Sequence, residues 1–461
     1  MSVIGAFVVP HPPISIPDIG KGEEQKIYTT INSYMKVADK IAAIKPETIV
    51  IVSPHATSYS DYIHISPGKM ASGDMSAFNA PSVFLGADYD TDFVQALCQQ
   101  AIDDAFPAGM FGESDPSLDH GTLIPLYYIS QKYTDFSIVR IGVSGLSYAE
   151  HYKLGMMIQK TANGLSRSTV IIGSGDLSHR LKADGPYGFA KEGAIYDSTI
   201  MSLLERAAFN ELFDFDENLC SLAGECGQRS FCIMAGALNS YSVSAKKLSY
   251  EDTFGVGYGL VEYIVTGTDI TRDFYGTWNK AHDEKIAKSV ANEDAFVSLA
   301  RKTINEFITN DKITVADDSL PDYLLNKRAG VFVSLHLNGK LRGCIGTISP
   351  VQKNIAEEII NNAIAAAVRD PRFSPLTIRE LKELHISVDE LFPPEDINSK
   401  DLLNVKEYGI IVTQGDKRGL LLPNLDGIDT INQQITIAKD KAGIDVTDDN
   451  FTMQRFKVIR H

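Results

Sequence analysis

Short runs of apolar, mostly β-branched residues that end in histidine constrain this fold more than any other feature. Val3–Val9 leads into Pro-His11, and Thr48–Val52 leads into Ser-Pro-His55. Two further apolar runs occupy Ser137–Val143 and Ser168–Ile172. Longer amphipathic stretches, such as Gln25–Ile44 and Tyr148–Asn163, lie between the runs. Continuous apolar runs separated by helices are typical of buried parallel strands. We therefore predict an α/β domain with a mostly parallel central sheet.

The pattern changes towards the C-terminus. Between Gly267 and Lys285 it loosens, and we predict a linker there. We expect one domain over residues 1–268 and a separate, smaller α+β domain over 283–461, which suits a chain of 461 residues. The elements expected in the second domain are helices over Asp283–Thr309 and Val351–Arg369, and strands over Gly330–Leu337, Ile386–Leu391, Gly409–Thr413 and Lys417–Leu422.

Composition excludes several classes of protein. The chain has 43 Lys+Arg against 59 Asp+Glu, a net charge of −16, which argues against a protein that grips phosphate backbones. No run of 18 apolar residues and no basic leader occurs, so we expect neither a membrane helix nor a signal peptide. Five cysteines without a Cys-x-x-Cys pair do not make a disulfide framework. A cytoplasmic location fits best.

Four histidines stand where a ligand site is expected. His11, His55 and His179 each follow a predicted strand, and His120 opens a predicted helix. Ligands of open α/β sheets bind beyond the carboxyl ends of the strands, so these four side chains are expected to converge. A single histidine beside proline or glycine is more often a turn residue. His64 and His151 lie inside predicted elements and are read as core residues.

Two imidazoles and one carboxylate form the facial site of mononuclear non-haem iron. The carboxylate candidate is Glu225, which lies in Ala-Gly-Glu-Cys-Gly just before an apolar helix. A solvated loop residue is the alternative for Glu225. Cys226 is a rival, softer ligand that favours a metal such as zinc or copper. Asp119 and Asp176 are expected to orient the neighbouring histidines.

These motifs together carry a family resemblance. Pro-His-Pro, Ser-Pro-His, Asp-His-Gly-Thr and Gly-Asp-Leu-Ser-His resemble the class III (LigB-like) extradiol ring-cleavage dioxygenases and the related Memo proteins over most of residues 1–265. The resemblance implies Fe(II) bound by His11, His55 and Glu225, with a catechol-like aromatic substrate and dioxygen. It implies that His179 is the acid/base group and that His120 contacts substrate or dioxygen.

Asp176 completes the predicted catalytic set.

The Memo branch resembles the dioxygenases in fold but places a cysteine where the dioxygenases place the glutamate ligand. Glu225 and Cys226 are adjacent here, so this sequence satisfies both patterns. Two functions therefore remain open: a ring-cleaving dioxygenase, or a metal-binding component without that activity. Dimers or larger assemblies are common in the dioxygenase family, so a homodimer is expected.

A second candidate site lies in the C-terminal domain. Cys344 stands between two glycines in Arg-Gly-Cys-Ile-Gly-Thr, with Arg342 beside it and Arg369 and Arg372 after the next predicted helix. Cations favour a thiolate, so these residues predict a reactive cysteine in a pocket for an anionic ligand. The alternative is a structural cysteine in a glycine-rich turn.

This region also resembles a known family. Arg-Gly-Cys-Ile-Gly-Thr, Asp-x-Arg-Phe-x-Pro, Ser-Val-x-x-Leu and Gly-Leu-Leu-Leu-Pro resemble the AMMECR1 domain over about residues 285–461. The fusion resembles systems in which AMMECR1-like, Memo-like and radical-SAM proteins occur together. It implies an accessory or substrate-presenting role for this domain and a radical-SAM protein as partner.

Overall fold

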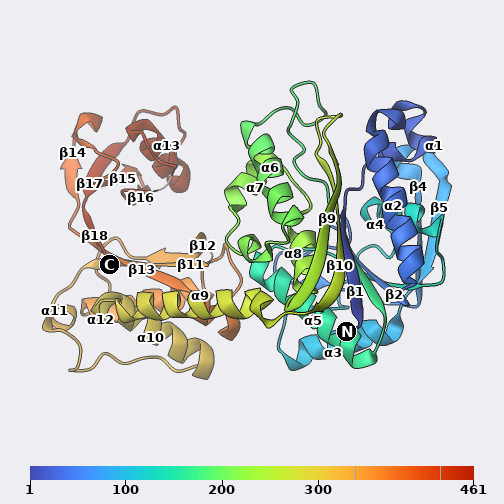
Figure 1. The fold of residues 1–461 in the computed structure, drawn as a ribbon. Coiled ribbons are helices and arrows are strands. Elements are labelled where there is room, and N and C mark those ends of the chain that lie inside the picture. Colours follow the sequence, from blue (N-terminus) through green and yellow to red (C-terminus); the bar gives the residue numbers. More distant parts are fainter. Residues whose placement is uncertain (338, 426) are drawn as a thin grey trace. The chain divides into compact units, whose positions relative to one another are not determined.

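The computed structural model describes residues 1–337, 339–425 and 427–461. The chain divides into two compact units, Met1–Ala281 and His282–His461. Each unit encloses its own hydrophobic clusters of buried residues. Figure 1 labels the helices and strands of both units.

A six-stranded sheet forms the centre of the N-terminal unit, in the order β7-β2-β8-β1-β10-β9. Strands β7, β2, β8 and β1 run parallel, and β10 and β9 extend the sheet as an antiparallel hairpin. The predicted α/β domain with a mostly parallel sheet is confirmed. The strands of this unit are β1 (Val3–Val9), β2 (Thr48–Val52), β3 (Ile63–His64), β4 (Met70–Met75), β5 (Ala80–Asp88), β6 (Ala108–Gly109), β7 (Ser137–Ile141), β8 (Thr169–Ser174), β9 (Tyr241–Glu251) and β10 (Tyr258–Thr268).

The central strands bury both faces. In β2, Val50 and Val52 enter a core with α5 and α8, whereas Ile49 and Ile51 enter a second core with α2 and α4. Figure 1 shows these two helix pairs on opposite sides of the strands. A strand covered on both faces needs apolar residues at every position, which explains the continuous runs. The helices are α1 (Pro17–Gly20), α2 (Tyr28–Ile44), α3 (Thr91–Asp103), α4 (His120–Ser130), α5 (Tyr148–Leu165), α6 (Lys191–Glu205), α7 (Glu217–Ala223), α8 (Gln228–Gly236) and α9 (Phe274–Ala291).

The strand register brings three loops to one edge of the sheet. Strand β8 lies between β1 and β2, with Ser174 opposite Val9 and Gly173 opposite Val52. All three strands are parallel, so the loops that follow them leave the sheet side by side. The residues after β1, β2 and β8 therefore meet at the carboxyl edge of the sheet.

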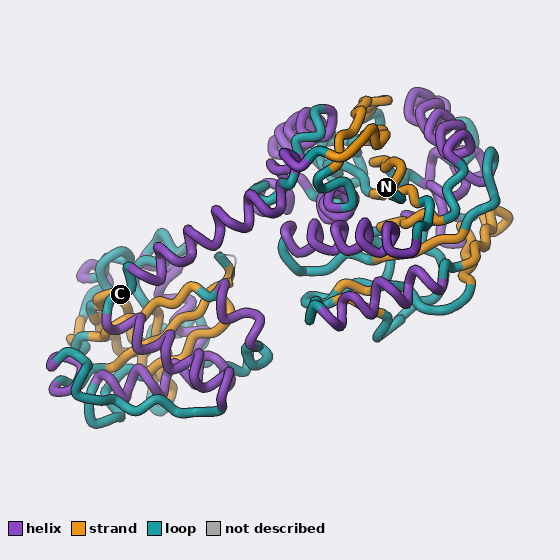
Figure 2. The backbone as a smooth tube through the Cα atoms, turned by 60° about the horizontal axis from the view of Figure 1, so that its bottom comes forward, coloured by secondary structure: helices purple, strands orange, loops and turns teal. Residues whose placement is uncertain are grey.

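The C-terminal unit consists of antiparallel sheets and helices. One sheet has the order β12-β11-β13-β18 and packs against α10 and α12; the other has the order β14-β17-β15-β16 and packs against α13. Figure 2 shows its strands in orange among purple helices. The elements are α10 (Ala295–Asn310), α11 (Asp322–Asn326), β11 (Gly330–Leu337), β12 (Lys340–Gly346), α12 (Ile355–Val368), β13 (His385–Leu391), β14 (Glu395–Ile397), β15 (Gly409–Gln414), β16 (Lys417–Leu421), α13 (Ile431–Ala442), β17 (Thr452–Phe456) and β18 (Val458–Arg460).

The segment predicted as a loose linker is ordered instead. It contains a single helical turn and then helix α9. Asp273 accepts a hydrogen bond from the Gly276 N–H at 3.1 Å, which stabilises the first turn of α9. Trp278 stacks on Phe213 with a distance of 5.0 Å between the ring centroids. In residues 1–337, 339–425 and 427–461 no helix is both long and apolar enough to cross a membrane.

Candidate metal and catalytic site

His11, His55 and Cys226 converge at the carboxyl edge of the sheet. The Nε2 atoms of His11 and His55 are 3.0 Å apart, and the Cys226 Sγ lies 3.5 Å from the His11 Nε2. The three donor atoms all lie within 4.8 Å of one another. His11 is almost completely buried, Cys226 is half-buried and His55 is the most exposed of the three, so the group opens to solvent on the His55 side.

Ser174, at the end of β8, fixes the tautomer of His11. The Ser174 hydroxyl lies 2.6 Å from the Gly121 carbonyl oxygen, which can only accept, and 2.9 Å from the His11 Nδ1. A hydroxyl has one proton, so it donates to Gly121 and accepts from the Nδ1–H of His11. The lone pair of the His11 Nε2 therefore points towards His55 and Cys226. From the sequence, Ser174 is predicted only to lie in the loop that leads to Asp176 and His179 at the metal crevice.

Close backbone contact holds Cys226 in place. A Cβ on Gly175 would lie 2.1 Å from the Gly227 Cα, so only glycine allows the two loops to approach this closely. The Asp176 N–H donates to the Cys226 Sγ at 3.3 Å. Burial, and then the carboxyl groups of Asp176 and Glu225, raise the pKa of the Cys226 thiol well above its usual range. A bound cation would offset this effect.

Glu225 lies outside this group. Its carboxylate accepts a hydrogen bond of 2.7 Å from the Gln228 N–H at the first turn of α8, where the helix dipole favours an anion. Burial raises the pKa of Glu225 to about 7, although the hydrogen bond from Gln228 and the charge of Arg229 act against this. The structure thus brings Cys226, the alternative ligand, to the histidines and engages the predicted ligand Glu225 in the helix.

His120 lies against the pair. The ring centroids of His55 and His120 are 4.0 Å apart. Asp119 caps α4 by accepting from the Thr122 N–H at 3.1 Å, and its carboxylate also binds the Ser53 hydroxyl, which accepts from the His55 N–H at 3.2 Å. Burial, and then His55, lower the pKa of His120 to about 4. Asp119 therefore orients the segments of both histidines.

His179 and Asp176 occupy the β8 side. Burial, and then His55, lower the pKa of His179 to about 4, and among the described residues its buried Nε2 has no hydrogen-bond partner. Tyr187 stacks on its ring at a centroid distance of 5.0 Å. The Asp176 carboxylate accepts from the His11 N–H at 2.7 Å, and burial raises the pKa of Asp176 to about 7. The three strand-end histidines and His120 thus lie together.

The four imidazoles are electrically neutral near pH 7. Burial, and then the neighbouring histidines, hold the pKa of His11 well below its usual range, and burial also lowers the pKa of His55. A neutral imidazole is the form that binds a metal. His64 and His151 lie in the core of the domain, as their sequence context predicts. His151 is held by the Ser144 N–H and the Ser147 carbonyl.

The three converging donors fit a transition-metal ion. Two nitrogens bound to one ion at about 2.1 Å lie about 3.0–3.4 Å apart for bond angles of about 90–109°, and a nitrogen and a sulfur bound at about 2.1 and 2.3 Å lie about 3.1–3.6 Å apart. The observed separations are 3.0 Å between the two Nε2 atoms and 3.5 Å between the His11 Nε2 and the Cys226 Sγ. The two separations at the His11 Nε2 therefore match those expected at one metal ion, and the three donor atoms together lie within 4.8 Å of one another.

Cys344 has different surroundings. Its sulfur, on β12, accepts a hydrogen bond from the Ser334 hydroxyl at 3.2 Å, and its N–H donates to Asp370 at 2.9 Å. Arg372 donates to the Cys344 carbonyl at 3.2 Å and to Asp370 at 2.7 Å. Hydrogen bonding to Arg372 lowers the pKa of Asp370 to about 2. Of the three predicted arginines, Arg372 therefore contacts Cys344.

The other two predicted arginines lie elsewhere. The Arg342 Nε pairs with Glu380 at 2.7 Å, and its Nη1 donates to the Ser374 carbonyl at 2.8 Å. Arg369 follows the last residue of α12 and is exposed. A ring of three arginines around Cys344 is thus not formed, because Arg342 is long enough to reach a carboxylate further along the chain.

Comparison with known proteins identifies both regions. Residues 5–261, more than half of the chain, match the catalytic LigB subunit of aromatic ring-opening dioxygenase, and residues 297–461 match AMMECR1. A protein of Clostridium acetobutylicum is 39% identical over 472 residues, which cover 100% of this chain and 99% of the relative. A protein of Thermotoga maritima is 46% identical over 170 residues, 37% of this chain and 98% of the relative.

Solved structures are matched with low scores. An uncharacterized protein from Pyrococcus horikoshii has a TM-score of 0.34 at 30% identity and covers 36% of this chain and 88% of that chain. An uncharacterized protein from Escherichia coli K12 has a TM-score of 0.38 at 15% identity, with 57% and 99% covered. The family matches cover both domains, and the chain therefore belongs to the LigB family and carries an AMMECR1 domain after its LigB domain.

Proposed function

We propose that the LigB-like domain is a metal-dependent oxidoreductase domain in which His11, His55 and Cys226 hold one transition-metal ion. The observation that carries this proposal is the pair of distances at the His11 Nε2, 3.0 Å to the His55 Nε2 and 3.5 Å to the Cys226 Sγ. The orientation of Glu225 supports it, because the Glu225 carboxylate is engaged by the Gln228 N–H.

The donor set bears on the identity of the metal. Two imidazoles and a thiolate are softer than two imidazoles and a carboxylate, and they suit copper or zinc better than the Fe(II) of facial-triad oxygenases. Copper fits a reaction in which the metal itself exchanges electrons, whereas zinc has no redox chemistry and acts only as a Lewis acid. The bound ion would supply Lewis acidity and electron transfer at the His55 edge, where the group opens to solvent.

The residues around the ion have separate roles. Ser174 holds the His11 ring with its Nε2 lone pair facing the ion, and Asp176 holds the His11 backbone. His179 is neutral near pH 7 and has a free buried Nε2 among the described residues, so it is the group best placed to take a proton from a substrate. His120 lines the same side as His55.

X-ray absorption at the edge of the bound metal tests the ligand set. The expected first shell contains one sulfur at about 2.3 Å and two nitrogens at about 2.0–2.1 Å. The protein is purified without oxygen, and Glu225→Gln, which keeps the three proposed donors, is measured beside the wild type as the control. A first shell of nitrogen and oxygen alone in the wild type would contradict the proposal.

A second candidate function is ring cleavage with Fe(II), dioxygen and a catechol-like substrate. The feature that favours it is the group of His120, His179 and Asp176 beside the donors, because ring cleavage needs proton transfers at the substrate hydroxyls. Oxygen uptake after anaerobic Fe(II) loading, with a panel of catechols, tests this function. Uptake that depends on the catechol supports it, and no uptake with any catechol rejects it.

The role of the AMMECR1-like domain is a further proposal. We infer an accessory role in which this domain presents a substrate or engages a partner such as a radical-SAM protein. Support comes only from the presence of both domains in one chain. Binding of a purified radical-SAM protein to the full chain, with the Cys344→Ala and Arg372→Gln variants alongside, tests this role, and sedimentation of the chain alone tests the expected homodimer.

A further inference from the structure

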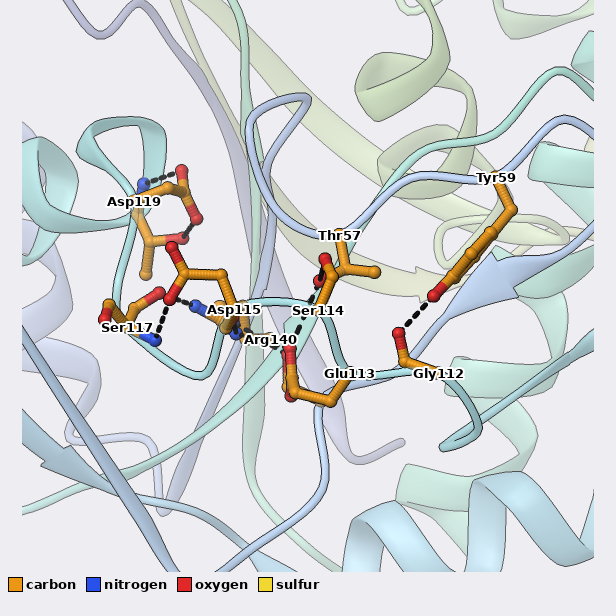
Figure 3. Close-up of polar contacts among 11 residues, drawn as sticks. Thr57, Tyr59, Gly112, Glu113, Ser114, Asp115, Ser117, Asp119 and Arg140 are labelled. Carbon is orange, nitrogen blue, oxygen red and sulfur yellow. Dashed lines mark hydrogen bonds and ion pairs between the residues drawn. The ribbon is translucent and has the colours of Figure 1, made fainter.

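Arg140 is a charged residue in the middle of a buried apolar strand. It lies on β7 and is 0% exposed. The guanidinium donates from Nε to the Ser66 hydroxyl at 2.8 Å, and from Nη2 to Glu113 at 3.2 Å and to the Asp115 carbonyl at 3.1 Å. Its Nη1 donates to the Ser117 carbonyl, and Figure 3 shows this network around the guanidinium. Arg140 thus fastens segment 113–117 to the sheet.

Arg140 carries its charge on an otherwise apolar strand. The flanking residues Val139 and Ile141 are fully buried and apolar. Removing a charge from water is unfavourable, and well-packed apolar residues often replace a buried ion pair without loss of stability. What the pair adds over apolar residues is directional contact, with donors in the fixed fork of the guanidinium.

Glu113 links the same network to the loop that carries His55. The Thr57 hydroxyl donates to Glu113 at 3.2 Å and lies 3.0 Å from the Ser114 hydroxyl. Thr57 is two residues beyond His55 and is buried. One Glu113 oxygen therefore binds the β7 arginine and the His55 loop together (Figure 3).

Segment 113–117 also leads directly to His120. The Ser117 N–H donates to the Asp115 carboxylate at 2.9 Å, and Leu118 donates to the Ser72 carbonyl at 3.1 Å. The chain then reaches Asp119, which caps the helix that begins at His120. The Arg140 network therefore contacts both the segment before His120 and, through Glu113, the loop after His55.

We propose that Arg140 and Glu113 are positioning residues that set the separation between the rings of His55 and His120. Those ring centroids are 4.0 Å apart, and neither ring contacts Arg140 directly in a hydrogen bond. The inference rests on the proposed function for its meaning, because His55 is a proposed metal ligand. The separation of the two rings can be measured in the chain without metal, so its test does not depend on metal binding.

The test uses the full chain with 13C-labelled histidine. His55 and His120 resonances are assigned with His55→Gln and His120→Gln. Rings 4.0 Å apart shift each other's proton resonances and give a ring-to-ring NOE. Glu113→Gln, Arg140→Lys and Thr57→Val are expected to move both resonances and to weaken the NOE. Thr57→Val removes one hydroxyl and keeps the shape, so it stays informative if Arg140→Lys fails to fold.

A matched pair serves as the control. Arg206 and Glu211 form an ion pair in the same unit with side chains 54% and 44% exposed. Arg206→Lys and Glu211→Gln make the same chemical changes as the test variants, and neither is expected to move the His55 or His120 resonances. A shift of equal size in the controls would overturn the inference.

Metal affinity gives the second readout. Competition with a chelator for Zn²⁺ is expected to show a loss of about 10–100-fold in Glu113→Gln, the usual effect of removing a group that orients a ligand. If Glu113→Gln and Thr57→Val lower only the melting temperature, with affinity and NOE unchanged, the pair is merely structural and the inference is wrong. If the wild type binds no metal, the proposed function fails, and the NOE still decides the inference.

Discussion

Two half-buried cysteines, Cys226 and Cys344, lie in opposite chemical surroundings. The Cys226 sulfur faces the His11 Nε2 at 3.5 Å, beside three more neutral histidines. The Cys344 sulfur accepts a hydrogen bond from Ser334 and lies in a segment braced by Arg372. Each cysteine has a glycine next to it in the sequence: Gly227 follows Cys226, and Gly343 precedes Cys344.

The difference lies in the charge of the neighbouring groups. Neutral imidazoles offer electron pairs, so the Cys226 region can hold a cation. An arginine offers only N–H donors, and Arg372 is already paired with the Asp370 carboxylate at 2.7 Å, so the cation of the Cys344 region is an arginine in place of a metal. Carboxyl groups report the same contrast. Burial raises the pKa of Asp176 to about 7, whereas hydrogen bonding to Arg372 lowers the pKa of Asp370 to about 2.

The largest effect is expected from replacing His179, which tests whether this residue is a catalytic group or a metal ligand in the Cys226 region. His179→Ala should keep the metal but lower turnover by about 10²–10⁴-fold, because an acid/base group is lost while the three donors remain. Metal content and the rate of substrate-dependent oxygen uptake are measured on the same sample. Loss of the metal from this variant would make His179 a ligand and would redraw the region.

The next effect concerns the loop contact that delivers Cys226. Gly175→Ala places a Cβ 2.1 Å from the Gly227 Cα, so backbone must move, at a cost of about 1–3 kcal/mol in unfolding free energy. Gly164→Ala in α5 is the matched control, since nothing lies within 4 Å of its new Cβ, and it should gain about 0.5–1 kcal/mol. Urea unfolding measures both, and a neutral Gly175→Ala would refute the close contact.

Buried carboxyls give the first region a characteristic pH dependence. Burial raises the pKa of Asp197 to about 7. Between about pH 4 and 7 the folded state therefore holds a proton that the unfolded state has released, so stability falls as pH rises through this window. Asp197→Asn, which can still accept from the Ser178 N–H, should flatten that slope by up to about 1.4 kcal/mol per pH unit.

Trp278 is the one tryptophan of the chain and stacks on Phe213 in the N-terminal unit, so its fluorescence follows the unfolding of that unit. An Asp370→Asn variant gives the comparison for the Cys344 region. The pKa of Asp370 is lowered in the folded wild type, so the stabilising effect of this carboxylate is present above about pH 4 and is lost as pH falls towards 2. Equal slopes in wild type and Asp197→Asn between pH 4 and 7 would contradict the assignment.

The smallest effect is expected on the rate at which Cys344 reacts with iodoacetamide. Iodoacetamide forms an S–C bond with a thiolate and releases iodide, and nearby positive charge favours the thiolate. Arg372→Gln should slow the labelling of Cys344 by a few-fold, because Arg372 contacts the Cys344 carbonyl. Arg342→Gln is the control, since its guanidinium pairs with Glu380, and it should leave the rate unchanged. Identical rates in the two variants would favour a purely structural Cys344.

The fold was largely predictable from the sequence, and the orientation of single side chains was not. Strands Val3–Val9 and Thr48–Val52 have the predicted bounds because burial on both faces leaves an unbroken apolar signal. Strand β8 runs on to Ser174, beyond the predicted end at Ile172, because Gly173 and Ser174 pair with neighbours but carry no strand signal.

The site shows the same limit. The strand-end rule predicted that His11, His55 and His179 meet at one edge, where His120 joins them from the start of α4. Whether Glu225 or Cys226 faces the histidines depends on where α8 begins, because adjacent residues in a turn point in different directions. The sequence pattern did not single out Arg140, because its partners come from loops that follow no period. Its importance therefore emerges only from the structure.

Metal content of three proteins tests the central claim most directly. Wild type, Cys226→Ser and Glu225→Gln are purified without oxygen, and metal per chain is determined by mass spectrometry. If His11, His55 and Cys226 hold the ion, the wild type and Glu225→Gln carry about one metal per chain and Cys226→Ser carries almost none. Metal retained by Cys226→Ser and lost from Glu225→Gln would contradict the account and return the third ligand to the carboxylate.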